Sequence, residues 1–387
     1  MAPSSMLMVG IESLFEKKEK MFNSIINRLF LISCLAIVRT AIAVELPEGI
    51  SYSHIFLSDQ TSVHVLEVNP HFFDIIPVKN KGDVEAVSSM AKRHKAIAAV
   101  NGGFFKMKGE FADLPMGILK IDNHWYGTPH KPRGAIGWSH ADEKVLFDQI
   151  LTQIYGYSGN AVIPIDGINR ILKDQQVILC TPHIGKQFDY PNLGLQLLIK
   201  DQKVSKIEKK RASIPADGVS LMIGVLKTLS FPPIAEGDDF EWDIHVTPQS
   251  HPPYTKSEEW SDIVHIVGGT PILVRGGRLV TDFSAEQTGS HFLNVRLART
   301  AVGILENGNW LFVVVDGFYK NIWNTKGITI PDLAELMQKL GCVEALNLCG
   351  GKCSTMVLKN VVVNDPPDGT RKGRKVSDAL VIIPKNR

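Results

Sequence analysis

Short apolar segments separated by turn residues dominate this chain, and they limit its possible folds more than any other feature. The clearest segment, 62–68, alternates apolar and polar residues, as a strand with one solvated face does. Residues 96–100 form a continuous apolar run typical of a buried strand. Further strand patterns lie at 117–121, 134–138, 175–180, 194–199, 219–224, 263–267, 271–274, 301–305, 310–315, 343–348, 356–363 and 379–383. Helical spacing occurs at 83–94 and at 331–340, where Pro331 opens the helix and Gly341 follows it.

Strands therefore outnumber helices, and no regular alternation of the two is visible, which argues against a doubly wound parallel sheet. The chain has 387 residues, of which 44% are hydrophobic and 21% charged, a composition typical of a globular protein. We predict a single α+β domain with a large mixed, mostly antiparallel sheet and flanking helices. The proline-rich segment 231–254 and the region 257–262 are interpreted as surface excursions.

The start of the chain has the pattern of a secretory signal peptide. An apolar run at 29–38 follows four basic residues, and Ala41-Ile42-Ala43 forms a small-x-small cleavage site. The run is too short to span a bilayer permanently. We predict an upstream extension and signal peptide at 1–43 and one domain at 44–387, exported to the periplasm or the extracellular space without a stable membrane span. An uncleaved N-terminal anchor is the alternative.

Charge gives no reason to expect nucleic acid as a partner. The chain has 42 Lys and Arg against 40 Asp and Glu, and the charges are interspersed. No N-x-[ST] glycosylation sequence occurs, which favours a bacterial source for an exported protein.

Cysteine spacing leaves disulfides open and argues against a metal site. Without Cys34 of the signal region, Cys180, Cys342, Cys349 and Cys353 remain, and they could form two disulfides in three pairings. A zinc site at the last two would need further ligands, but no C-x-x-C pair or closely spaced His pair is present. We predict no metal site and no cofactor, although the sequence leaves a divalent cation open.

Three strand ends carry polar groups suited to a ligand. The first is Asn101-Gly102-Gly103 after the apolar run, with an amide side chain and an open backbone; a plain turn is the alternative. In the second, Arg299 and Thr300 begin one strand of a hairpin and Asp316 follows the other. An Arg there can hold a phosphate, and a carboxylate can serve as a general base, although Asp-Gly is also common in turns.

The third strand end is the loop 347–355, which contains Asn347, Gly350, Gly351 and Ser354. Its glycine amides and its hydroxyl groups are suited to binding oxygen atoms. The spacing G-x-x-x-x-G-K-[ST] is missing, so this is not a nucleotide-binding P-loop, and no G-x-S-x-G elbow of an esterase occurs.

Taken together, these segments resemble the phosphodiester glycosidase family. Matching motifs follow the family's order over about 95–385, so the resemblance covers most of the chain. They lie at 98–105, 115–117, 166–170, 178–182, 214–218, 267–271, 276–277, 299–303, 315–317, 327–340, 345–356 and 376–383. The motif at 166–170 adds Asn169 to the candidate ligand-binding residues.

The last loop departs from the family pattern, which usually reads Asn-Leu-Asp-Gly-Gly-Gly-Ser. Here Cys349 replaces the Asp, Lys352 replaces the third Gly and Cys353 replaces the Ser. Leu297-Ala298 also stands where the family often has His-Pro. The resemblance implies the family's fold, whereas these changes bear on its activity.

The resemblance implies a hydrolase that cleaves a glycosyl phosphodiester, or a related glycan linkage, at the anomeric carbon. Asp316 would orient water, and Arg299 with Thr300 would hold the phosphate. The remaining candidates would bind sugar or phosphate oxygens: Asn101, Gly102, Gly103, Asn169, Asn347, Gly350, Gly351 and Ser354. Phosphate is a good leaving group, so one carboxylate could suffice.

Two other hypotheses follow from the altered loop. One is a family member that has lost catalysis and binds cell-wall glycan or a sugar phosphate, with a Cys349–Cys353 disulfide as the structural reason for the cysteines. The other is thiol chemistry at Cys349. We favour the hydrolase, and both the hydrolase and the binding protein would have a carbohydrate or sugar-phosphate ligand.

Overall fold

The computed structural model describes residues 45–385, apart from 83, 110, 185–188, 252, 318–325, 368 and 371. The predicted extension and signal peptide at 1–43 lie outside these residues. Within the described part of the chain, no helix is long and apolar enough to cross a membrane.

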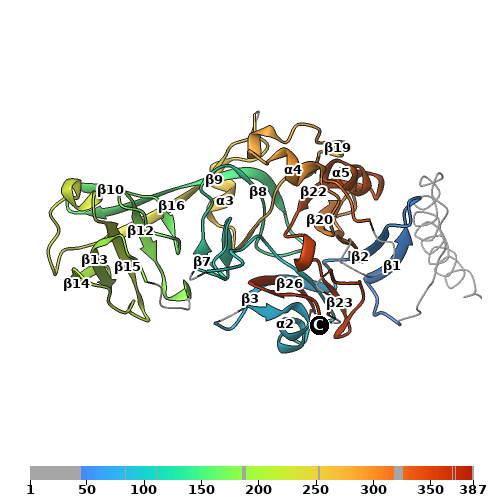
Figure 1. Ribbon diagram of the computed structural model, residues 1–387, viewed down its shortest axis with the longest axis horizontal. Coiled ribbons are helices and arrows are strands. Elements are labelled where there is room, and N and C mark those ends of the chain that lie inside the picture. The colour runs from blue at the N-terminus through green and yellow to red at the C-terminus, as the bar shows by residue number, and fades with distance from the viewer. Residues whose placement is uncertain are drawn as a thin grey trace, which may run out of the picture.

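Strands make up most of the fold, and they pair into several separate sheets (Figure 1). Sheet I has the order β1 (Ile50–Phe56), β2 (Ser62–Val68), β21 (Trp310–Val315), β20 (Arg299–Leu305), β22 (Cys342–Asn347), β18 (Ile272–Arg275) and β19 (Arg278–Leu279). Sheet II has the order β24 (Val361–Val362), β23 (Met356–Leu358), β5 (Ala98–Asn101), β26 (Asp378–Pro384) and β3 (Phe73–Lys79).

Two further sheets extend the molecule away from this pair. Sheet III has the order β10 (Ala161–Ile165), β9 (Leu146–Ser158), β8 (Arg133–Trp138), β17 (His265–Gly268), β6 (Leu119–Ile121) and β7 (His124–Gly127), with β16 (Glu241–Pro248) also paired to β9. Sheet IV has the order β11 (Gly167–Ile168), β12 (Val177–Cys180), β15 (Gly218–Gly224), β13 (Leu193–Lys200) and β14 (Lys203–Glu208). A short pair joins β4 (Glu85–Ala86) to β25 (Lys375–Val376).

The predicted antiparallel pairing is confirmed, since β11 with β12 is the parallel exception among the described pairs. The prediction of one large sheet is wrong, because the strands separate into the sheets above. Helices are also fewer and shorter than an α+β fold with flanking helices implies. They are α2 (Val87–Arg93), α3 (Ser257–Ser261), α4 (Ser290–Asn294) and α5 (Ile330–Lys339), with single turns η1 (Pro182–Ile184), η2 (Lys227–Ser230), η3 (Ser284–Glu286) and η4 (Gly351–Cys353).

The longest of these helices, α5, follows the sequence signals closely. The Thr329 hydroxyl accepts a hydrogen bond from the Asp332 amide (3.2 Å), which caps the first turn, and Pro331 lies inside that turn. Leu333 and Met337 are buried on one face. Gly341 has φ +90°, a conformation that ends the helix at little cost for glycine.

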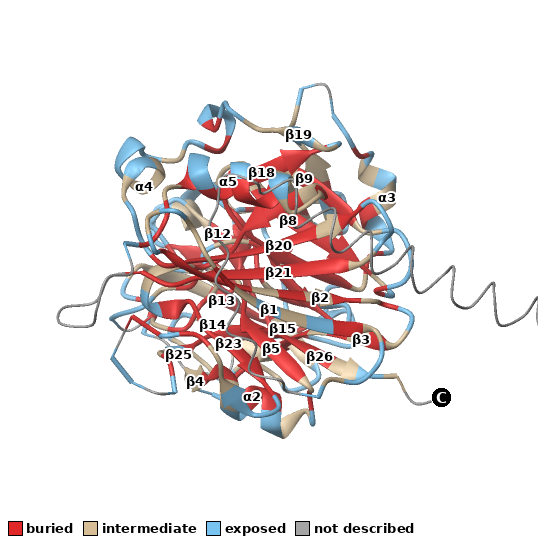
Figure 2. Ribbon diagram, turned by 90° about the vertical axis from the view of Figure 1, so that its right-hand side faces the viewer, coloured by how far each residue is buried: buried red, intermediate tan, exposed pale blue. Residues whose placement is uncertain are grey.

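Sheets I and II pack face to face, and each carries a helix on its outer side (Figure 2). Leu66 and Phe312 from sheet I meet Val100 and Leu380 from sheet II in the largest core. The other face of sheet I is covered by α5, and the other face of sheet II by α2. The order of layers is thus helix, sheet, sheet, helix.

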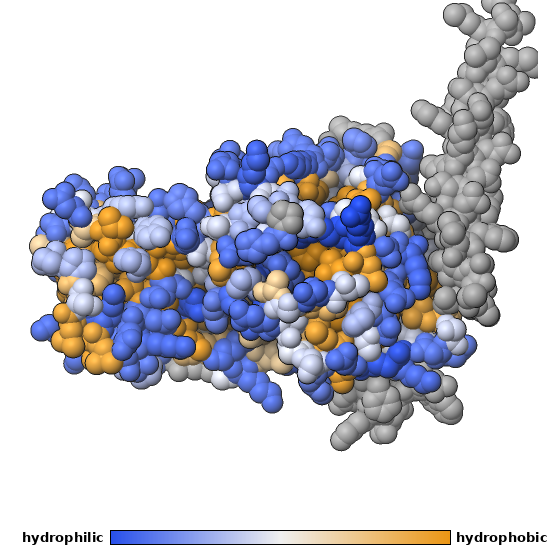
Figure 3. Space-filling model, turned by 90° about the horizontal axis from the view of Figure 1, so that it is seen from above, coloured by the Kyte–Doolittle hydropathy of each residue, from blue (hydrophilic) through white to orange (hydrophobic). Residues whose placement is uncertain are grey.

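The long strand β9 connects this sandwich to a distal lobe, which consists of sheet IV with β10 and β16 (Figure 1). Its first residues pair with β8, whereas its last residues pair with β10 and β16. The distal lobe has its own core, with Ile154, Leu179 and Phe240 among its members. Viewed from above, the molecule is elongated, and hydrophobic and hydrophilic residues are mixed over its surface (Figure 3).

The two segments interpreted as surface excursions contain a paired strand and a short helix. Within 231–254, β16 pairs with β9 from Glu241 to Pro248. Within 257–262, α3 places Trp260 in the distal core at 1% exposure, and its indole N–H donates to the Thr255 hydroxyl (2.8 Å). The prolines of 231–254 suggested a surface position. In 257–262, the buried Trp260 side chain fixes the segment against the core.

Replacing Trp260 by Ala should lower the free energy of unfolding by about 3–5 kcal/mol, because it leaves a large cavity beneath Gly137. Urea denaturation followed by circular dichroism measures this change. Leu229→Ala is the control, since Leu229 is 86% exposed and its loss should cost less than about 0.5 kcal/mol. Equal denaturation midpoints for the two variants would contradict this packing.

Candidate active site

A buried hydrogen-bond network joins strand ends that are far apart in the sequence. Asn101 ends β5, and its amide N–H donates to the Cys349 carbonyl (2.6 Å). Its amide oxygen accepts from the Thr300 hydroxyl (2.8 Å) and from the Thr355 backbone N–H (3.1 Å). Sheets I and II are therefore linked through one side chain at this end of the sandwich.

Asn347 ties the end of β22 to the neighbouring loop. Its side-chain N–H donates to the Thr270 carbonyl (2.6 Å), and its backbone carbonyl accepts from the Thr270 N–H (2.8 Å). Gly269 must lack a side chain, since a Cβ there would lie 2.4 Å from the Asn347 carbonyl oxygen. The buried Asn347 side-chain oxygen has no hydrogen-bond partner.

The glycine loop, residues 347–355, packs against other parts of the same chain. The Gly351 N–H donates to the Ala298 carbonyl (2.7 Å), and a Cβ at Gly350 would approach the same carbonyl. Lys352 is exposed, whereas Ser354 is fully buried, and the Ser354 hydroxyl lacks a hydrogen-bond partner. The loop thus packs against the start of β20.

Arg299 and Asp316 point to opposite faces of sheet I. The Arg299 guanidinium donates to the carbonyls of Phe292 and Val295 (2.8 and 2.9 Å), and burial lowers the Arg299 pKa to about 10. On the other face, Asp316 accepts from the Ser62 hydroxyl (2.8 Å) and lies 2.9 Å from His64 Nε2. Their predicted roles stay predictions, but the two side chains do not face each other.

Asn169 lies apart from this network, at the base of the distal lobe. It has φ +51°, and its amide exchanges hydrogen bonds with Thr181, whose N–H and hydroxyl lie 2.8 and 2.9 Å away. The structure therefore brings Asn101, Thr300, Asn347 and the glycine loop together and leaves Asn169 outside.

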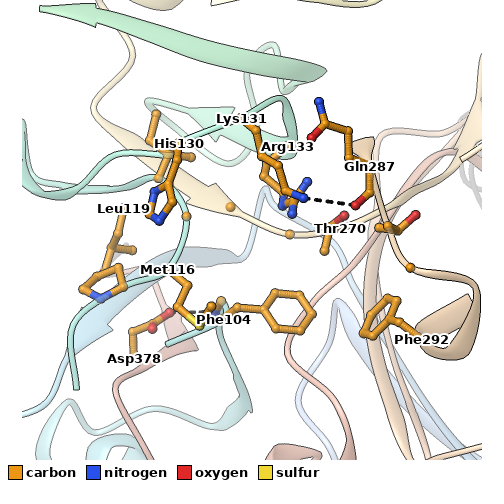
Figure 4. Close-up of a pocket in the computed structure, with 18 residues that line it drawn as sticks. Phe104, Met116, Leu119, His130, Lys131, Arg133, Thr270, Gln287, Phe292 and Asp378 are labelled. Carbon is orange, nitrogen blue, oxygen red and sulfur yellow. Dashed lines mark hydrogen bonds between the residues drawn. The ribbon is translucent and has the colours of Figure 1, made fainter. Parts of the chain in front are cut away.

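A cavity of 480 Å³, the central pocket, adjoins this network (Figure 4). Among the predicted residues, Gly103 lines it. The rest of its wall comes from segments that were not singled out, chiefly 115–119, 130–133, 268–270 and 287–292, with Asp378. Most of the predicted polar residues thus support the pocket from behind, and other side chains face it.

Asp378, at the start of β26, supplies the carboxylate of the central pocket. One carboxylate oxygen accepts a hydrogen bond from the Gly103 N–H (2.8 Å). Burial is the main cause that raises the Asp378 pKa to about 6. Sequence reasoning missed this residue, although it precedes an apolar strand just as Asp316 follows one, and the same logic could have found it.

Basic side chains line the opposite wall, above the aromatic residues in Figure 4. The Lys131 ammonium donates to the Gln287 carbonyl (3.1 Å), and the Arg133 guanidinium donates to the carbonyls of Pro132 (2.9 Å) and Glu286. The His130 pKa is lowered to about 4, first by burial and then by the charges of Arg170, Lys173, Arg133 and Lys131. This wall therefore has a positive field that favours an anion.

An apolar wall completes the pocket. The rings of Phe104 and Phe292 lie edge to face with centroids 6.1 Å apart, and Met116 lies beside them. The Arg299 guanidinium stacks behind Phe292, 4.8 Å from the ring centroid. Such a surface can pack against the apolar face of a sugar ring while the basic wall binds its charged substituent.

The four cysteines of the described region are buried thiols, so none of the disulfides that the sequence left open, including Cys349–Cys353, is formed. A hydrogen bond with Cys353, together with burial, raises the Cys349 pKa well above its usual value. A nucleophilic cysteine requires a lowered pKa, so these surroundings do not favour thiol chemistry at Cys349. No cluster of three or more His, Cys, Asp or Glu side chains suited to a metal occurs in the part of the chain that the structure describes.

Comparison with known proteins finds a family match over part of the chain. The family model described as phosphodiester glycosidase matches residues 202–383. This part of the chain is therefore similar to the phosphodiester glycosidase family. Within the matched region lie β20, the glycine loop and Asp378, whereas Gly103 and Arg133 precede it.

A curated relative also matches part of this chain. N-acetylglucosamine-1-phosphodiester alpha-N-acetylglucosaminidase of Bos taurus is 33% identical over 128 residues, which cover 30% of this chain and 24% of that enzyme. The chain thus spans about a quarter of the length of that curated relative.

Solved structures show the same fold at low identity. A hypothetical protein from Synechocystis superposes with a TM-score of 0.73 at 22% identity, covering 88% of this chain and 63% of the other. A protein from Burkholderia pseudomallei, whose name suggests that it is exported, gives 0.69 at 18% identity and covers 86% and 75%.

Gly102→Ala should disturb the central pocket, because the added Cβ would lie 1.9 Å from the Asp378 carboxylate. We expect this carboxylate to move and the hydrogen bond to the Gly103 N–H to be lost, which lowers the unfolding free energy by about 1–3 kcal/mol. Chemical denaturation measures this loss. Gly289→Ala is the matched control, since a Cβ there meets no atom within 4 Å; equal stability of the two variants would refute the close contact.

Proposed function

We propose that the protein is a hydrolase that cleaves a glycosyl phosphodiester at the anomeric carbon, with the reaction in the central pocket. The observation that carries this proposal is one buried carboxylate facing a wall of basic side chains across an aromatic surface (Figure 4). The match of residues 202–383 to the phosphodiester glycosidase family model supports the same reaction class.

The basic wall gives the phosphate a binding position. Lys131 and Arg133 supply two positive charges, and the carbonyl groups they contact still leave donors for an anion. His130 is neutral near pH 7, so it could donate a hydrogen bond to phosphate without adding charge. The sugar ring would then rest against Phe104 and Phe292.

Asp378 is the proposed general base. Water attacks the anomeric carbon, the bond from that carbon to the phosphate oxygen breaks, and the electron pair leaves with the phosphate. The water proton passes to the Asp378 carboxylate. Phosphate leaves readily without protonation, so a single carboxylate suffices, unlike the pair in an ordinary glycosidase.

The predicted residues around the pocket take supporting roles in this proposal. Asn101 and Asn347 fix the two loops that carry Gly103 and Thr270, and Arg299 backs Phe292. Arg299→Ala and Asp316→Ala, assayed beside Asp378→Asn, test the direct roles that the family resemblance implies for them.

Binding without hydrolysis is the second candidate function. It is favoured by Cys349, a buried thiol at the position where the family usually has the loop aspartate. Tight binding of a glycosyl phosphodiester by the unaltered protein, with no turnover, would support it over the hydrolase.

Export is also part of the proposal. It rests on the apolar run at 29–38 before Ala41-Ile42-Ala43, and on a structural relative whose name suggests export. The mass of the protein recovered from the periplasm or medium would show cleavage after Ala43.

Asp378→Asn should lower kcat on a hexose 1-phosphate methyl ester by at least about 100-fold, because an amide cannot accept the water proton. Lys131→Ala should instead raise KM, with an effect that shrinks as salt increases. Lys339→Ala on α5 is the control for the lost charge. Full activity of Asp378→Asn, with the fold intact by circular dichroism, would remove the base from the mechanism.

The rate should also depend on pH through Asp378. Its pKa of about 6 means that kcat/KM should fall as pH drops below 6, since the protonated acid cannot act as a base. Stability should change the other way, because a folded-state pKa above the ordinary value makes ionisation destabilising as pH rises from about 4 to 6. A pH–rate profile with unfolding midpoints separates the two effects; constant activity down to pH 4.5 would contradict the assignment.

A further inference from the structure

A second cavity lies between the β6–β7 hairpin and the distal lobe, and neither the family assignment nor the central pocket accounts for it. This hairpin cavity has a volume of 650 Å³ and is lined by the β6–β7 turn, the η1 turn, the β13–β14 turn and the facing parts of β15 and β16. Figure 1 shows β7 beside the strands of the distal lobe. The volume lies within the range of small-ligand sites.

Aromatic side chains form one part of its lining. Trp125 and Phe240 are almost fully buried, whereas Trp242 on β16 is partly exposed. The rings of His124 and His183 meet edge to face, with centroids 4.4 Å apart. A partly exposed indole beside polar rings is the kind of surface on which the C–H face of a sugar packs.

Polar groups from two tight turns form the rest of the lining. Asn123 in the β6–β7 turn and Gln202 in the β13–β14 turn have φ of +63° and +58°, and both side chains are exposed. Lys200 and Asp217 form an ion pair of 2.8 Å on the same rim. These side chains offer both donors and acceptors, which the hydroxyl groups of a sugar require.

The charge of the hairpin cavity is opposite to that of the central pocket. Its lining holds one cation, Lys200, against the three carboxylates Asp201, Asp217 and Glu241. The central pocket has Lys131 and Arg133 against Asp378. A phosphate would be repelled from the hairpin cavity, whereas a neutral sugar would not.

We propose that the hairpin cavity binds a neutral sugar residue of a glycan, with Trp242 as the stacking surface and the two turns as hydrogen-bonding groups. Leu119 lines the central pocket and Asn123 lines the hairpin cavity. These two residues are at most about 14 Å apart along the chain. One oligosaccharide could therefore reach both. This last step rests on the proposed function.

Isothermal titration calorimetry of the full chain with neutral hexasaccharides of glucose and of N-acetylglucosamine tests the site. We expect binding of at least one of them, weakened about tenfold or more by Trp242→Ala, the value expected for one lost stacking contact. Tyr254→Ala is the matched control, because Tyr254 is 60% exposed and lies outside the cavity. Failure of both hexasaccharides to bind would overturn the proposal.

Asn123→Gly provides a second variant if Trp242→Ala folds poorly. Glycine keeps the positive φ of the turn and removes the side-chain amide, so weaker binding would again locate the sugar here. Unchanged affinity in both folded variants would show that the glycan binds elsewhere and would overturn the site.

The same variants separate this inference from the proposed function. Trp242→Ala should leave turnover of hexose 1-phosphate methyl ester unchanged, because that substrate occupies the central pocket. Binding that depends on Trp242 without any turnover would refute the hydrolase and keep the glycan site. Turnover without hexasaccharide binding would refute the glycan site alone.

Discussion

The side chain of Asn101 holds the two packed sheets together where the candidate site lies. It connects β5 of sheet II to β20 of sheet I and to the glycine loop between the two sheets through three buried hydrogen bonds. An amide in this position has both a donor and an acceptor, which neither a carboxylate nor a hydroxyl supplies in the same geometry. Because these groups are shielded from water, each bond lost would leave an unsatisfied partner, so the strand ends are held in one arrangement.

This fixed frame determines where charge can be placed. Asp378 packs closely against Gly102 and Gly103. The basic wall comes from a separate segment, residues 130–133, which leads into β8. Burial favours the neutral acid, whereas the Gly103 N–H favours the carboxylate, and burial dominates. In the resulting pocket, the Asp378 carboxylate lies opposite the positive charges of Lys131 and Arg133. The hairpin cavity, built on other turns, has the opposite balance of charge and suits a different part of a ligand.

Local pattern predicted many elements well, and each of its failures has a structural reason. The strand predictions 62–68 and 310–315 coincide with β2 and β21, and 331–340 lies within a residue of α5. The longest strand, β9, was missed because its first half lies in one sheet environment and its second half in another, so no single alternation runs through it. The segment at 356–363 is two strands joined by a turn at Lys359 and Asn360, whose positive φ the apolar pattern concealed.

By itself the sequence determined the predominance of antiparallel strands, the capped helix α5 and the family resemblance, because these depend on neighbouring residues and ordered motifs. It also indicated that polar strand ends such as Asn101, Thr300 and Asn347 matter. Only the tertiary structure decided that Arg299 and Asp316 point to opposite faces of a sheet, and that Asp378, Lys131 and Arg133 surround one cavity. The physical reason is that a side chain's direction and burial depend on which strands pair and how the sheets pack, and those partners lie hundreds of residues apart.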